Sequence, residues 1–297
     1  MLRKTLNFTV ITVLVLAMLM LSACQSTPQL PTTEPMQLQS EPTVPTQPAT
    51  EPSEPAATEP TATKPATTEP PVTEPPVTEP PVTEPAEKTY TICIDPGHQR
   101  YGIFDKEPNG PGSSVMKTKL AAGTRGVSTG IAEYQLNLDV SLLLEQELIK
   151  RGYNVVMIRR TNDCPLSNAE RSQVANDSGA DIFVRIHANG LEDSSANGML
   201  TCAPTTKNPY LSDDVIRESI RLSRTMVDAF CAATGAKNLG ILSTDTMTGI
   251  NWCQIPVTIV EMGFMSNPEE DQRMATDEYR ALMVQGIADG IDAYFAE

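Results

Sequence analysis

Apolar runs alternate with amphipathic segments from residue 89 onward, and this alternation predicts an α/β domain. Short apolar runs closed by Gly, Pro or polar residues predict strands at 89–95, 154–158, 181–187, 198–203 and 257–261. Further segments predict helices at 133–151, 167–178, 212–233 and 276–295. We expect a mixed, mostly parallel twisted sheet with helices on both faces.

The helical segments also show where two of the helices begin or end. In 133–151 the apolar residues Leu136, Val140 and Leu144 keep helical spacing, and Gly152 ends the pattern. Ser167 is followed three residues later by Glu170, which is the arrangement of a capping box at a helix start.

The polar stretch at 99–130 fits neither pattern. It is rich in Gly and Pro and longer than an ordinary connection between a strand and a helix. We therefore interpret it as a candidate functional loop.

The first 24 residues have the layout of an export signal. A basic start with Arg3 and Lys4 precedes an apolar run at 8–21, which is shorter than the ~20 residues that span a bilayer. The run ends in Leu21-Ser22-Ala23-Cys24, which resembles the lipobox of bacterial lipoproteins. We predict a signal peptide at 1–24, lipidation of Cys24 and attachment to the outer face of the cell membrane. An ordinary secretory signal or an uncleaved anchor is the alternative.

The following segment, 25–88, has the composition of a disordered linker. It holds 17 of the 25 prolines, together with many Thr, Glu and Ser residues. Its few apolar side chains cannot offset the entropy of folding. An extended tether of this length reaches at most about 200 Å, at ~3.1 Å per residue. A generic solvated stalk is an equally good interpretation, so the linker bears on location rather than chemistry, and 89–297 is the predicted catalytic domain.

Charge and cysteine content exclude two classes of site. Of the formal net charge of −15, the linker contributes −8 and the body −9, with +2 from the N-terminus. No basic stripe is present, so we expect no nucleic-acid partner. Five cysteines follow Cys24 and none forms a CxxC pair, which argues against a cysteine zinc cluster. Two disulfides with one thiol left over remain open, and so does their pairing.

The two histidines of the chain occupy equivalent places in the predicted fold. His98 lies just beyond the first strand, and His187 ends another strand. In open α/β sheets functional groups collect beyond the carboxyl ends of strands, so both imidazoles are expected on one rim.

Two glutamates complete a plausible metal rim. A catalytic zinc site normally has three protein ligands, and Glu133, in the first turn of a predicted helix, is the best third candidate. The alternative is a glutamate favoured there by the helix dipole. Asn137, one turn later, could support its carboxylate. Glu261 closes the most apolar strand, where desolvation would raise its pKa toward that of a useful base, unless it pairs with Arg171 or Arg185.

Four motifs in order resemble the catalytic domain of zinc-dependent N-acetylmuramoyl-L-alanine amidases of the type 3 family. They are Asp95-Pro96-Gly97-His98, Glu133 with Asn137-Leu138, His187-Ala188-Asn189, and Glu261-Met262-Gly263-Phe264-Met265-Ser266-Asn267. The resemblance implies one Zn²⁺ held by His98, Glu133 and His187, with Glu261 as general base and acid. It also implies hydrolysis of the amide between N-acetylmuramic acid and L-alanine in peptidoglycan, by a catalytic domain expected to be monomeric.

The chain departs from that family pattern at three places. Gln99-Arg100 follows the first histidine where the family has Gly-Gly, Arg185 replaces a common serine, and the 99–130 loop is long. We expect Arg100, Arg185 and the 99–130 loop to contact the carboxylates of muropeptides, which arginine binds well. Asn189 is a further candidate for substrate binding. Arg159 and Arg171 are interpreted as structural ion-pair residues. The alternatives in function are a zinc peptidase acting on stem peptides and a non-catalytic wall-binding lipoprotein.

Overall fold

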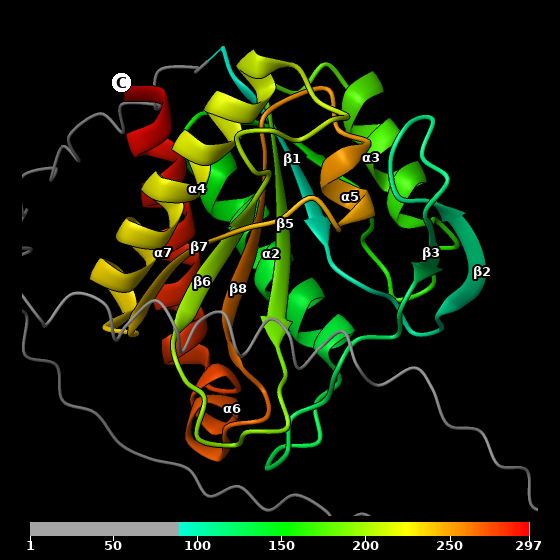
Figure 1. The fold of residues 1–297 in the computed structure, drawn as a ribbon. Helices are drawn as coiled ribbons and strands as arrows, with labels where there is room; N and C mark the ends of the chain where they lie inside the picture. Colours follow the sequence, from blue (N-terminus) through cyan, green and yellow to red (C-terminus); the bar gives the residue numbers. More distant parts are fainter. Residues whose placement is uncertain (1–88, 297) are drawn as a thin grey trace, which may run out of the picture. The chain divides into compact units, whose positions relative to one another are not determined.

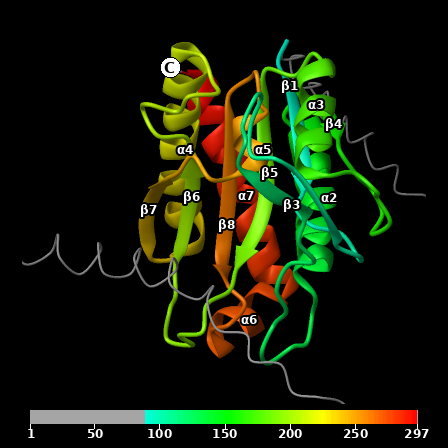
Figure 2. The ribbon, with the colours of Figure 1, turned by 45° about the vertical axis from the view of Figure 1, so that its right-hand side comes forward.

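A six-stranded mixed sheet forms the centre of the computed structural model, which describes residues 89–296. The strand order is β4 (Asn154–Met157), β1 (Thr91–Pro96), β5 (Ile182–Asn189), β8 (Val257–Phe264), β6 (Met199–Ala203), β7 (Asn238–Ser243). The first four strands are parallel, and β6 runs antiparallel to β8 but parallel to β7. Figure 2 shows β7 and β4 at the two edges. The predicted mixed, mostly parallel sheet is confirmed.

Helices cover both faces of this sheet (Figures 1 and 2). On one face α2 (Glu133–Lys150), α4 (Asp213–Thr234) and α7 (Asp277–Ala296) enclose the larger apolar cluster, which includes Leu144, Met226 and Ile287. On the other face α3 (Asn168–Asp177) and α5 (Thr248–Asn251) cover a smaller cluster around Phe183 and Ile259. These two apolar clusters hold the strands in place, and with them the strand ends that carry the site.

Local signals in the sequence explain several element boundaries. The predicted capping box is present: Glu170 N donates to Ser167 Oγ at 3.2 Å, and Ser167 N donates to Glu170 Oε2 at 2.7 Å. Gly235, with φ of 68°, ends α4 in the left-handed region that favours glycine. No helix in the described part of the chain combines the length and the apolar character needed to cross a bilayer.

The segment at 99–130 is more ordered than the predicted loop. It contains an antiparallel hairpin of β2 (Ile103–Pro108) and β3 (Met116–Leu120), which lies beside α3 and α5 in Figure 1. Side chains of the body bind its tip: Trp252 Nε1 donates to Pro108 O at 2.9 Å, and Asn251 Nδ2 donates to Asn109 O at 3.0 Å. The hairpin is therefore a fixed wall. Three further elements were not predicted, namely β7, α5 and α6 (Pro268–Met274).

The five cysteines of the described residues are all free thiols, so neither of the disulfides left open above is present there. Cys93, Cys202 and Cys253 are buried, and burial raises the pKa of Cys253 to about 12. The predicted signal peptide (1–24), its lipidation site Cys24 and the predicted linker (25–88) lie outside the described residues.

Candidate active site

The functional side chains come together because adjacent parallel strands end on one rim. β1 and β5 are neighbours, and His98 follows the end of β1 while His187 lies near the end of β5. Glu261 of β8 is the direct register partner of His187. Glu133 is the first residue of α2, which packs across β1 and β5. Residues far apart in the sequence thus meet as predicted.

Three donor atoms converge at this rim. Glu133 Oε1 lies 3.2 Å from His98 Nε2 and 3.3 Å from His187 Nδ1. One ligand atom from each of the three residues lies within 4.8 Å of the other two. The two imidazole rings are 4.8 Å apart between centroids and nearly perpendicular, at 79°. The structure therefore contains a candidate three-residue metal site.

The hydrogen bonds around the histidines fit a divalent cation. His98 Nδ1 lies 2.8 Å from Ala121 O, a carbonyl that can only accept, so Nδ1–H donates this hydrogen bond. Nε2 of the neutral ring then directs a lone pair at the Glu133 carboxylate, and two acceptors in contact need a proton or a cation between them. His187 Nε2 is buried without a hydrogen-bond partner among the described residues. Two imidazoles and a carboxylate are a common zinc ligand set.

Backbone and side-chain donors hold Glu133 in place. Thr124 N donates to its Oε2 at 2.8 Å, and Ala188 N donates to Oε1 at 3.2 Å. Asn137 Nδ2 reaches Oε1 at 3.3 Å and also Gly97 O at 3.2 Å, which is the supporting position expected for it. Burial raises the pKa of Glu133, but its contacts with His187 and His98 outweigh burial and bring the pKa well below 4.5. The carboxylate is thus ionised.

Glu261 has the opposite electrostatic setting. None of the ion pairs found within residues 89–296 involves its carboxyl, and Arg171 and Arg185 pair with Asp95 instead. Burial, followed by the negative charge of Glu133, raises its pKa to about 8. Pairing of Glu261 with Arg171 or Arg185 is therefore wrong. Two nearby carboxyl groups with pKa values driven apart are typical of an acid–base site.

A cavity of about 410 Å³ opens beside these groups. His98, His187 and Glu261 line it together with Lys117 of β3, Arg185 of β5 and Thr248 of α5. The hairpin thus contributes a cavity wall, in keeping with the candidate functional loop predicted at 99–130, and so does the start of α5, for which no role was predicted. A four-residue helix leaves no periodic signal in a sequence.

The residues expected to contact substrate have different surroundings. Arg100 is exposed, lies 3.5 Å from Asp163 and does not line the cavity. Arg185 lines the cavity but is nearly buried and donates to Asp95 at 2.9 Å and to Asn168 at 2.8 Å. Asn189 accepts a hydrogen bond from Gly190 N at 2.8 Å and lies away from the cavity lining.

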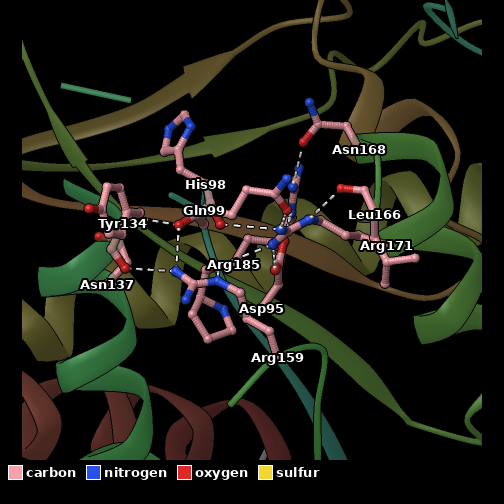
Figure 3. Close-up of polar contacts among 12 residues, drawn as sticks. Asp95, His98, Gln99, Tyr134, Asn137, Arg159, Leu166, Asn168, Arg171 and Arg185 are labelled. Carbon is pink, nitrogen blue, oxygen red and sulfur yellow. Dashed lines mark hydrogen bonds and ion pairs between the residues drawn. The ribbon is translucent and has the colours of Figure 1, made fainter. Parts of the chain in front are cut away.

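A buried polar network lies behind the first histidine (Figure 3). Asp95 accepts from Arg171 at 2.5 Å and from Arg185 at 2.9 Å, so Arg171 is the ion-pair residue that was predicted. Arg159 differs from the prediction, because it forms no ion pair with a carboxylate of the described chain. It donates instead to backbone carbonyls, including Tyr134 O at 2.7 Å.

The chain is similar in sequence to known proteins. Residues 92–293 match the family described as N-acetylmuramoyl-L-alanine amidase. The N-acetylmuramoyl-L-alanine amidase LytC of Bacillus subtilis is 27% identical over 205 residues, which cover 69% of this chain and 35% of LytC. The probable cell wall amidase LytH of Staphylococcus aureus is 28% identical over 211 residues, which cover 69% of this chain and 58% of LytH. The chain thus spans about a third of LytC and less than two thirds of LytH.

A solved structure shows the same fold. The apo crystal structure of the N-acetylmuramyl-L-alanine amidase Ami1 of Mycobacterium abscessus superimposes with a TM-score of 0.63 at 27% identity, covering 70% of this chain and 99% of Ami1. These matches favour an amidase over the stem-peptide peptidase and the non-catalytic wall-binding protein left open by the sequence. The chain belongs to the N-acetylmuramoyl-L-alanine amidase family and is a peptidoglycan hydrolase of the amidase class.

Proposed function

We propose that this amidase cleaves the bond between N-acetylmuramic acid and L-alanine with a zinc ion held by His98, Glu133 and His187, and with Glu261 as general base and acid. The observation that supports this proposal is the convergence of two imidazole nitrogens and one carboxylate oxygen within 4.8 Å, beside a cavity that Glu261 also lines. A zinc ion bound here would act as a Lewis acid that polarises an amide carbonyl and increases the acidity of water.

The protein's own groups divide the remaining work. Glu133, ionised and held by Thr124 N and Ala188 N, keeps its charge at the rim. Glu261 accepts a proton from the attacking water as the C–O bond forms. It then donates that proton to the amide nitrogen as the C–N bond breaks, which releases L-alanine with a free amino group. In the metal-free protein the pKa of Glu261 is raised to about 8, and a zinc ion nearby would lower it by favouring the ionised carboxylate, which is the form that accepts the proton.

The proposal also covers where the enzyme works in the cell. We infer an extracytoplasmic enzyme, since relatives such as LytH are named cell wall amidases. Lipidation of Cys24 would attach a monomeric catalytic domain to the outer face of the membrane, and the 25–88 linker would let it reach the wall. Replacing Cys24 with serine should move the protein from the membrane fraction to the soluble fraction. Unchanged membrane association of that variant would contradict the anchor.

Digestion of purified peptidoglycan tests the chemistry. Mass spectrometry should find stem peptides with an L-alanine amino terminus and glycan strands with free lactyl carboxyl groups. Cleavage inside the stem peptide would instead identify a peptidase. Glu261→Gln should retain one zinc per chain and lose about 10²–10⁴-fold in rate. The matched control, Glu192→Gln, changes an exposed loop glutamate and should keep full activity.

A further inference from the structure

The backbone of His98 has an unusual conformation. Its φ of 58° makes it the one non-glycine residue between 89 and 296 with a positive φ. A side chain with a Cβ atom is disfavoured in the left-handed region, so surrounding contacts must hold this conformation. The conformation matters because it directs the imidazole toward Glu133, where His98 Nδ1 is further fixed by Ala121 O.

Two buried arginines bind the carbonyls of three consecutive residues at this point (Figure 3). Pro96 O accepts from Arg159 Nε at 2.7 Å and from Arg171 Nη1 at 3.1 Å. Gly97 O accepts from Arg159 Nη2 at 3.0 Å, and His98 O accepts from Arg171 Nη2 at 3.2 Å. Hydrogen bonds from charged donors in a buried setting are stronger than those from neutral donors. These four bonds therefore fix the backbone of the turn from Pro96 to His98.

Gln99 extends this set of contacts in a way that the family pattern does not provide. Its side chain is buried, with Oε1 accepting from Arg171 Nη2 at 3.0 Å and Nε2 donating to Tyr101 O at 2.9 Å. The glycine that the family usually has here could not accept from Arg171. The departure noted in the sequence therefore adds a contact that fixes the arginine behind His98.

The charges of the network explain why the arginines can remain buried. Asp95 compensates Arg171 and Arg185 through direct ion pairs. Arg159 has carbonyl partners only, and burial followed by the nearby charge of Arg171 lowers its pKa to about 10. The contribution of Arg159 therefore lies in its hydrogen bonds, which reach Pro96 O, Gly97 O and Tyr134 O, together with Thr161 O and Asn162 Oδ1.

We propose that Arg159, Arg171 and Gln99 are positioning residues that set the metal affinity of the site by fixing the backbone of His98. This inference rests on the metal site proposed above. The three residues touch neither a metal ligand atom nor the cavity, and the two arginines donate four hydrogen bonds to the backbone of Pro96, Gly97 and His98. Loss of such supporting contacts typically weakens metal binding by about 10–100-fold.

Zinc affinity of the full chain, measured by competition with a chromophoric chelator, tests the proposal. Arg159→Lys should bind zinc about 10–100-fold more weakly and Gln99→Ala about 10-fold more weakly. Arg160→Lys is the matched control, because the adjacent arginine pairs with Glu145 of α2 instead of the turn. It should leave zinc affinity within about twofold of wild type, since a pair away from the metal supports no ligand. Thermal unfolding of the metal-free proteins, recorded in parallel, identifies any variant that has lost its fold.

A double-mutant cycle with His98→Ala separates positioning from general stability. If Arg159 acts through His98, then Arg159→Lys has no further effect on zinc affinity once His98 is alanine. An equal loss in both backgrounds would overturn the inference, as would wild-type affinity in both Arg159→Lys and Gln99→Ala. If Arg159→Lys fails to fold, Gln99→Ala decides alone. A wild-type chain that binds no zinc would refute the proposed function instead.

Discussion

Replacing Glu261 with glutamine should stabilise the metal-free protein at alkaline pH. In the unfolded chain this carboxyl has its ordinary pKa of 4.5, whereas burial and the charge of Glu133 raise the folded-state value to about 8. A raised folded-state pKa means that the folded protein binds the proton more tightly. Its contribution is fully present below pH 4.5 and is lost as the pH rises through about 8.

The size of the effect follows from that difference. Each unit of pKa difference is worth about 1.4 kcal/mol, so this difference corresponds to about 5 kcal/mol in the free energy of unfolding. Glu261 faces the cavity and keeps some contact with solvent, so we expect about 2–3 kcal/mol. For a domain of this size that corresponds to a melting temperature about 5–10 °C above wild type at pH 9. The advantage should be much smaller at pH 4.5.

Calorimetry of chelator-treated protein across this pH range is the appropriate assay. Glu192→Gln, which neutralises an exposed glutamate, controls for the change in net charge. A difference between Glu261→Gln and wild type that stays constant from pH 4.5 to pH 9 would refute the assignment of a raised pKa. Rebinding zinc should reduce the difference, because a nearby cation favours the ionised carboxylate.

Three other substitutions examine the support of the site. Gly97→Ala would place a Cβ atom 2.3 Å from the His187 ring, so elemental analysis should find less than one zinc per chain. Arg171→Met leaves the fully buried Asp95 with one cation fewer, and urea unfolding should show a loss of about 3–5 kcal/mol. Ser167→Ala removes the cap of α3 and should cost about 1 kcal/mol in the same assay, with peptidoglycan hydrolysis unchanged.

Most of the sheet and its long helices could be predicted because their periodicity reflects burial. The predicted helix at 133–151 and strand at 154–158 each end within one residue of α2 and β4. The β2–β3 hairpin could not be found this way, since its residues are largely polar and its tip is held by contacts from Trp252 and Asn251, far along the chain. A usable signal existed for α6: Asn267 as N-cap and Pro268 at the first position, followed by acidic residues.

Part of the candidate site could be predicted, because functional side chains collect beyond the carboxyl ends of parallel strands. His98, Glu133, His187 and Glu261 are close in space because parallel neighbours finish on one rim, and their roles stay proposals. The partners of arginines could not be predicted, because any of several carboxylates or carbonyls could satisfy a guanidinium. Arg185 illustrates this: it pairs with Asp95, although its departure from the family pattern suggested a contact with substrate.

The fixed position of the β2–β3 hairpin affects which stem peptides the enzyme cuts first. Since Pro108 O and Asn109 O are already bound by side chains of the body, the mouth of the cavity has its shape before anything enters. Docking then requires little ordering of the enzyme, and most of the entropic cost falls on the incoming strand. A stem peptide that already has the docked conformation should therefore be cut first, because it loses the least conformational entropy on binding.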